Sequence, residues 1–107
     1  MNTRLHIKVP RKAARGEVIK LMTKLHHPME SGWRKRQDGE PAPRDLVGEF
    51  VCSFNGEEVF RAELEAGTAA DPFLAFYARV ERSGTFRFTW GAEGGERYEA
   101  EAKVVVE

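Results

Sequence analysis

The stretch that decides the fold reads FVCSFNGEEVFRAEL and runs from Phe50 to Leu64. Apolar side chains recur at every second position on both sides of Asn55-Gly56, which is the period of a β-strand with one buried face. Asn-Gly between two such runs is a strong hairpin signal, because a type I′ turn needs positive φ at both central positions. We therefore predict an antiparallel hairpin whose inward side chains are Phe50, Cys52, Phe54, Phe60, Ala62 and Leu64.

The same alternation extends over most of the remaining chain. The helix propensity of residues 17–25 would allow a helix, but the β-branched residues and the alternation favour a strand there. Pro72 predicts an extended conformation for Asp71, the residue before it. Outside the hairpin, strands are expected over residues 5–9, 17–25, 73–80, 86–90 and 98–106, with turns at Ser83-Gly84 and Gly94-Gly95.

About seven short strands with closely spaced turns are typical of an immunoglobulin-like β-sandwich. We therefore predict an all-β fold with residues 1–107 as a single domain. The one cysteine leaves no internal disulfide, so the core must rely on Phe, Trp and Leu side chains. A chain of this size can bury roughly 65% of its unfolded surface, enough for one core without a metal or disulfide.

Charge and hydropathy narrow the class of function. The 107 residues carry 17 basic and 17 acidic side chains, and no apolar run approaches the roughly 18 residues of a membrane span. Residues 1–44 hold 11 basic and 4 acidic residues, whereas residues 45–107 hold 6 and 13. Net neutrality argues against a nucleic-acid binder, and the N-terminus lacks the apolar run of a signal peptide. The basic residues at 11–15 and 34–36 are candidate docking edges for protein partners.

Few residues could carry chemistry. Imidazole, thiolate and thioether groups suit zinc, copper or iron, so His6, His26, His27, Met29 and Cys52 are weak candidates for a metal site. Adjacent histidines on a strand point to opposite faces, and the alternative is that they lie beside a turn. Cys52 is either a buried, inert thiol or an interchain or redox thiol, and the second role requires exposure and a neighbouring cation. No set of residues assembles an active site, so we predict no enzyme activity and no cofactor.

The segment from Gly32 to Arg44 reads as an exposed loop of a length that is usually functional or mobile. Its large apolar residue, Trp33, is followed by Arg34, Lys35 and Arg36. An aromatic beside arginine is the composition of a protein–protein hot spot, although Trp33 could also fold back onto the rim of the domain.

Four blocks of sequence together resemble the SoxZ family of the sulfur-oxidation (Sox) system. They lie in order along the chain and are His27-Pro28-Met29-Glu30-Ser31-Gly32, Phe54-Asn55-Gly56-Glu57-Glu58-Val59-Phe60-Arg61-Ala62, Asp71-Pro72-Phe73 and Gly84-Thr85-Phe86-Arg87-Phe88-Thr89-Trp90. The resemblance implies an immunoglobulin-like, non-catalytic subunit of the SoxYZ carrier complex. In that complex the sulfur intermediates of thiosulfate and sulfur oxidation are bound covalently to a cysteine on a swinging arm of the SoxY subunit.

The resemblance also implies partners and a location. A SoxY-like subunit is the expected partner, in a heterodimer or larger complex, and the SoxAX, SoxB and SoxCD enzymes are expected to visit it. The family setting is the periplasm, reached by co-export with SoxY, with no nucleic acid or membrane partner. We expect partner docking at His27, Met29, Trp33, Arg34, Lys35 and Arg36, while Cys52, in mid-strand, cannot swing. The alternatives are a small His/Met metal-binding sandwich and a generic structural interaction module.

Overall fold

In the computed structural model, which describes residues 5–27, 29, 37–40, 46–64 and 70–107, the alternating stretches form strands. The order is β1 (Leu5–Lys8), β2 (Lys12–Ala13), β3 (Glu17–Leu25), β4 (Val47–Phe54), β5 (Glu57–Glu63), β6 (Phe73–Val80), β7 (Gly84–Ala92) and β8 (Arg97–Val106). No helix that could span a membrane occurs among these residues.

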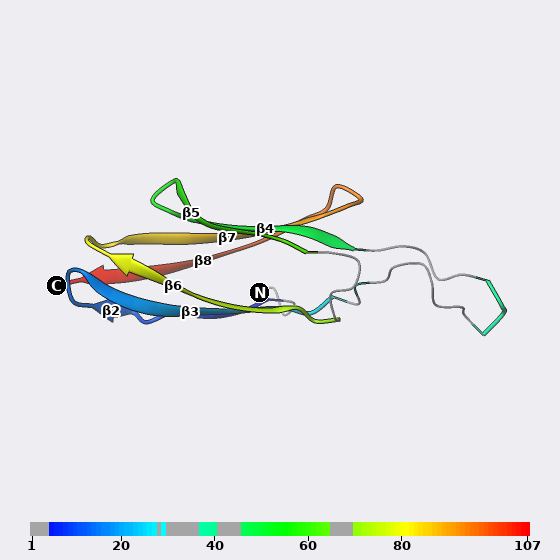
Figure 1. Cartoon of the computed structure of the whole chain (residues 1–107), viewed down its shortest axis with the longest axis horizontal. Helices are drawn as coiled ribbons and strands as arrows, with labels where there is room; N and C mark the ends of the chain where they lie inside the picture. Colours follow the sequence, from blue (N-terminus) through cyan, green and yellow to red (C-terminus); the bar gives the residue numbers. More distant parts are fainter. Residues whose placement is uncertain (1–4, 28, 30–36, 41–45, 65–69) are drawn as a thin grey trace.

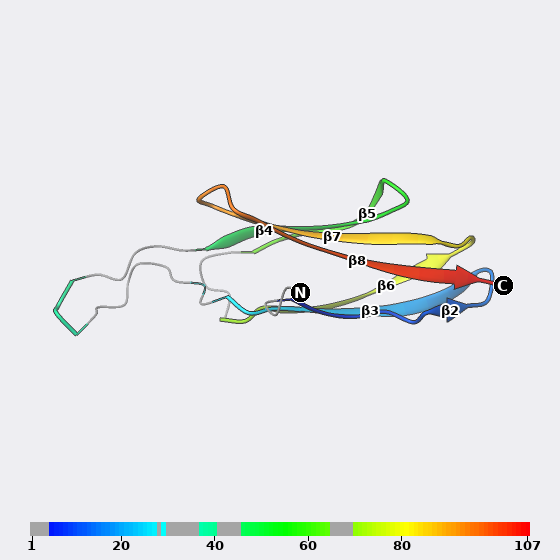
Figure 2. The ribbon, with the colours of Figure 1, turned by 180° about the vertical axis from the view of Figure 1, so that it is seen from behind.

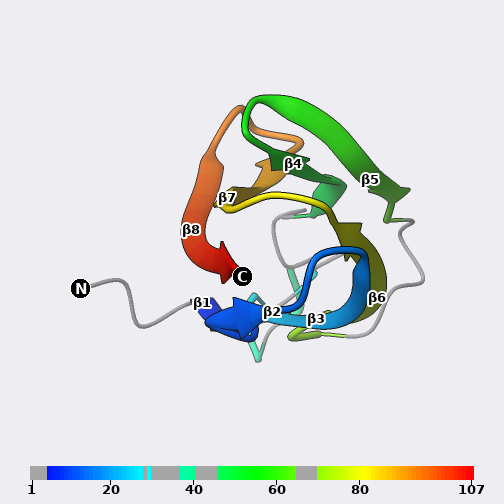
Figure 3. The ribbon, with the colours of Figure 1, turned by 90° about the vertical axis from the view of Figure 1, so that its left-hand side faces the viewer.

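The strands form two sheets that face one another (Figures 1 and 2). One sheet has the order β1-β3-β6 and the other the order β2-β8-β7-β4-β5. β3 and β6 are neighbours in the first sheet, whereas β4 and β5, which lie between them in the sequence, belong to the second. Strands from both halves of the sequence therefore occur in each sheet. Seen along the strands, β8 lies beside β1 and β2 on one side, and β5 and β6 lie together on the other (Figure 3). The predicted immunoglobulin-like sandwich is confirmed.

The predicted Asn-Gly hairpin joins β4 to β5 as expected. Asn55 and Gly56 have φ values of 50° and 89°, and Phe54 pairs with Glu57 across the turn. The register shifts after Cys52, which pairs with Phe60, because Val59 forms a bulge. The turn and the alternation therefore fix which faces of both strands point inward.

The alternation of β3 decides its conformation and its packing. Ile19, Leu21, Thr23 and Leu25 are all buried, whereas the residues between them face outward. β3 pairs with β6 over its full length, from Glu17 opposite Val80 to Lys24 opposite Phe73. The strand favoured from the sequence is therefore correct, and the helical alternative is not.

Aromatic side chains fill the space between the sheets, as predicted for a chain without an internal disulfide. Phe50 is fully buried, with ring centroids 4.9 Å from Trp90 and 5.8 Å from Phe76. Phe76 from β6 stacks on Phe60 from β5 at 4.2 Å, which joins the two sheets on their open side. Each buried aromatic ring removes about 150–250 Å² from water, so this cluster accounts for much of the core.

The sequence missed one strand. Lys12 and Ala13 pair in parallel with Val105 and Val106 of β8, so the described residues contain eight strands where about seven were expected. A strand of two residues is too short for a period of two to be recognised. It also places part of the basic segment 11–15 at a sheet edge, where Lys12 lies 3.9 Å from Glu107.

Candidate functional site

Two hydrogen bonds between His27 and Asp71, one between backbone groups and one to the Asp71 carboxylate, hold the end of the sandwich where β3 finishes and β6 begins. The amide of Asp71 donates to the carbonyl of His27 at 2.7 Å, and the amide of His27 donates to Asp71 Oδ1 at 2.9 Å. Asp71 has a φ of 52°, so the extended conformation predicted from Pro72 is wrong. Asp and Asn tolerate this left-handed region better than other residues, and here both polar groups of Asp71 bind His27.

The imidazole of His27 points into the protein. Its side chain is 1% exposed, its Nδ1 accepts the amide of Met29 at 3.0 Å, and its ring lies 6.0 Å from that of Tyr98. Because Nδ1 accepts a hydrogen bond, the proton of the neutral ring is on Nε2. Met29 is 7% exposed and has a φ of 50°, so the chain turns sharply out of β3 around the ring. We call this arrangement of His27, Met29 and Asp71 the histidine turn.

This placement changes the role of two residues expected to dock a partner. His27 and Met29 are buried in the free chain, so they present no surface to a partner there. Trp33, Arg34, Lys35 and Arg36 lie outside the described residues. Residues 37–40 lie beyond the end of both sheets (Figure 1), and there Asp38 Oδ1 accepts the amide of Glu40.

The other histidines lie on the outside of the same end. His26 and His27 follow the last residue of β3; His26 is exposed whereas His27 is buried, and His26 Nδ1 is 3.7 Å from Asp71 Oδ1. The His6 ring packs edge-on against His26 at 4.9 Å. Within the described ranges, no group of three His, Cys, Asp or Glu side chains is placed to hold a metal ion.

Cys52 lies in the middle of β4, between β5 and β7, and is 0% exposed. Burial raises the pKa of its thiol to about 12. A nucleophilic cysteine needs a thiolate and an open approach, and Cys52 has neither. The structure therefore favours the buried, inert thiol over the interchain or redox thiol.

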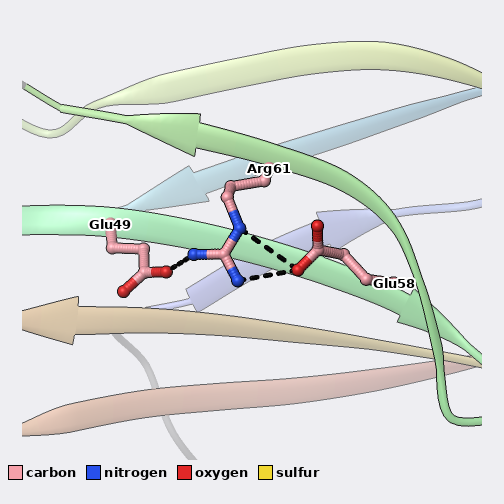
Figure 4. Close-up of polar contacts among 3 residues, drawn as sticks. All are labelled: Glu49, Glu58 and Arg61. Atoms are coloured by element: carbon pink, nitrogen blue, oxygen red, sulfur yellow. Dashed lines mark hydrogen bonds and ion pairs between the residues drawn. The ribbon is translucent and has the colours of Figure 1, made fainter.

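Two arginines on the outer face of the five-stranded sheet are paired with glutamates. Arg61 on β5 binds Glu58 with both Nε and Nη2, at 3.1 and 2.7 Å, and also pairs with Glu49 on β4 (Figure 4). On β7, Arg87 binds Glu101 on β8 directly opposite it, at 2.7 Å, and this hydrogen bond raises the pKa of Arg87. Charges that are already paired across strands offer a partner little new electrostatic attraction.

The fold of this chain is similar to that of several solved structures. A superoxide reductase (neelaredoxin) from Ignicoccus hospitalis is 17% identical, with a TM-score of 0.72 and coverage of 96% of this chain and 80% of that one. A putative superoxide reductase from Thermotoga maritima is also 17% identical, with a TM-score of 0.73 and coverage of 96% and 85%. The sulfur carrier protein SoxY from Chlorobium limicola f thiosulfatophilum is 17% identical, with a TM-score of 0.69 and coverage of 99% and 81%. At this identity the likenesses show the fold alone.

The sequence itself identifies the family. The model of the family described as sulphur oxidation protein SoxZ matches residues 7–103, so the chain belongs to the SoxZ family. The predicted resemblance is thereby confirmed over nearly the whole chain. A comparison with curated proteins finds no match.

Sequence reasoning missed two partners of His27. Tyr98 begins the strand expected over residues 98–106, but nothing in its spacing indicates that its ring lies near His27. The sequence pattern gives Asp71 a predicted role only as the residue before Pro72. Because β4 and β5 lie between His27 and Asp71 in the sequence, no local pattern indicates that these two residues meet.

Proposed function

We propose that this chain is a non-catalytic subunit that binds a SoxY-like carrier subunit during thiosulfate and sulfur oxidation. The observation that carries the proposal is the burial of Cys52, the one cysteine of this sequence. A sulfur carrier needs a thiol that enzymes can reach, and this thiol is enclosed by two neighbouring strands. The substrate would therefore ride on the cysteine of a partner chain.

The SoxZ family membership supports the identity of that partner. Members of this family are paired with SoxY in the Sox system, and SoxY supplies the swinging arm. The chain would then hold SoxY and give the SoxAX, SoxB and SoxCD enzymes a body on which to dock while they act on the arm. The setting would be the periplasm, reached by co-export with SoxY.

The histidine turn supports a place for the partner contact. It fixes the direction in which the chain leaves β3, and the segment that follows contains Trp33 and the basic residues 34–36. We place the SoxY contact on this segment, with Trp33 as its anchor. A buried tryptophan at the centre of an interface is worth about 2 kcal/mol or more of binding free energy.

The test is co-expression of this chain with the SoxY-like subunit of the same organism, followed by co-purification and titration calorimetry. The wild-type pair should co-purify, and Trp33→Ala should weaken the affinity about 30-fold. Val105→Ala, at a position 47% exposed on β8, is the matched control and should leave the affinity unchanged. A chain that does not bind the SoxY-like subunit would refute the proposed function. A Trp33→Ala variant that binds normally would refute only the placement of the contact.

A further inference from the structure

The outer face of the three-stranded sheet differs in charge from the rest of the sandwich. Its outward positions alternate with the buried residues of β1, β3 and β6. They hold the following residues: His6, Lys8, Val18, Lys20, Met22, Lys24, Phe73, Ala75, Tyr77 and Arg79. None is an aspartate or glutamate. Glu17 is the first residue of β3, and Asp71 and Glu81 lie just outside β6, so the described carboxylates stand at the ends of these strands. We call this surface the basic face.

The lysines of the basic face have no ion pair among the described residues. Lys8, Lys20 and Lys24 are exposed and make no salt bridge there, and Arg79 donates to the carbonyl of Gly16 at 3.4 Å. On the opposite face of the sandwich, by contrast, Arg61 and Arg87 are each paired with glutamates. The basic face therefore keeps its positive potential for an external partner.

Exposed aromatic residues lie among these cations. Phe73 is 58% exposed and Tyr77 66% exposed, on alternate outward positions of β6. Register places Lys24 beside Phe73 and Lys20 beside Tyr77. A shallow hollow of about 370 Å³ is lined by Phe73, Met22, Thr23, Ile7, His6, Lys8 and Lys24. An apolar hollow with lysines around it fits an apolar side chain that has carboxylates as neighbours.

We propose that the basic face is a docking surface for a protein that presents acidic side chains around an apolar one. Charge complementarity selects the acidic partner, and the aromatic and methionine side chains give it an apolar contact. The mixture of lysines and few apolar groups is suited to brief, electrostatically steered docking rather than to a permanent subunit interface, which would be larger and more apolar.

A protein partner accounts for this face better than a nucleic acid does. Three lysines and one arginine are fewer than the roughly 6–10 phosphate contacts of a typical DNA-binding protein, and the whole chain is neutral. The inference goes beyond the proposed function, since it concerns a second surface on the opposite side of the three-stranded sheet from the core. It holds for the free chain and does not require the SoxY-like subunit.

The experiment is an NMR titration of the ¹⁵N-labelled full chain with a synthetic peptide that has a central leucine flanked by aspartates and glutamates. The control peptide replaces each acid by its amide. Shifts should concentrate on outward positions of β1, β3 and β6 and should weaken between about 0.02 and 0.3 M salt. Lys20→Glu with Lys24→Glu should raise the Kd about tenfold or more, and Phe73→Ser with Tyr77→Ser should do the same.

Matched variants lie on other strands. Lys103→Glu changes an exposed lysine of β8, and Val59→Ser changes a β5 side chain that is 48% exposed. Both should leave the Kd within about twofold. All these positions are exposed, and circular dichroism confirms that each variant is folded before titration.

Four results would overturn the proposal. The acidic peptide could give no shifts on the basic face, or the amide peptide could bind equally well. Vesicles of anionic phosphatidylglycerol could bind through the same residues more tightly than the peptide, which would make the face a membrane surface. The basic-face variants could lose the SoxY-like subunit, which would make the face the carrier interface. A wild-type chain that binds the peptide but not the SoxY-like subunit would instead count only against the proposed function.

Discussion

Replacing His27 by alanine tests whether the histidine turn holds this end of the sandwich. The variant keeps both hydrogen bonds between residue 27 and Asp71, because they use the peptide groups of residue 27 and the amide and carboxylate of Asp71. It removes the acceptor of the buried Met29 amide and the ring that packs 6.0 Å from Tyr98. The effect therefore reports on the imidazole alone.

The expected loss can be estimated from these two contacts. An unsatisfied buried amide costs about 1–3 kcal/mol, and truncation of a large buried side chain leaves a cavity that costs about 2 kcal/mol. We expect the free energy of unfolding to fall by about 3–5 kcal/mol. For a domain of this size each kcal/mol corresponds to roughly 4–8 °C in Tm, so the Tm should fall by about 15 °C or more.

Urea denaturation followed by circular dichroism measures the change, provided that the m-value is unchanged. His27→Asn is the informative second variant, because an amide oxygen can accept the Met29 bond and should restore about 1 kcal/mol or more. His26→Ala is the control, since the His26 side chain is 45% exposed, and it should shift stability by no more than about 0.5 kcal/mol. A His27→Ala variant within about 1 kcal/mol of wild type, or no gain from His27→Asn, would refute the reasoning.

Three other predictions follow from the core and its turns. Phe50→Ala should cost about 3–5 kcal/mol in urea unfolding, since Phe50 is 0% exposed and packs on rings from both sheets, whereas a loss below about 1 kcal/mol would contradict its central position. Cys52 should resist iodoacetamide at pH 9 until the chain is unfolded, because burial raises the pKa of its thiol to about 12. The same raised pKa means that the contribution of the neutral thiol to stability is complete below about pH 9 and is lost as the pH rises toward 12. Cys52→Ala should remove this pH-dependent loss. Gly84→Ala should lower the Tm, because a Cβ there would meet the Asn55 side chain, whose Oδ1 accepts the Thr85 amide at 2.9 Å; an unchanged Tm would show that Asn55 can move aside at no cost.

Local pattern predicted most of the fold because nearly every strand here has one buried face. The alternation of β3 gives its inward residues Ile19 to Leu25 correctly, and Asn55-Gly56 gives the hairpin. Local pattern could not predict the strand at Lys12, which forms because Lys12 and Ala13 pair with Val105 and Val106 at the edge of β8. Pairing of that kind depends on the assembled sandwich and leaves no periodic trace in the sequence.

In the candidate site too, local pattern predicts some features, while others depend on how the strands assemble. The sequence predicts that His27 and Met29 dock a partner, whereas the structure shows that both are buried in the free chain. Their burial depends on Asp71 and Tyr98, which are distant in sequence and arrive from other strands. The excess of positive charge was expected in connecting segments, yet Lys20 and Lys24 of the basic face come from a regular strand. Which strands share a sheet decides where charge accumulates, and that is a property of topology.

The central claim is that this chain supports a sulfur carrier without carrying sulfur itself. Its most direct test is intact-mass spectrometry of the co-purified complex after incubation with thiosulfate and the Sox enzymes. We expect sulfur adducts on the SoxY-like subunit alone, with this chain at its unmodified mass. A sulfur adduct on Cys52 of the folded chain would contradict the claim.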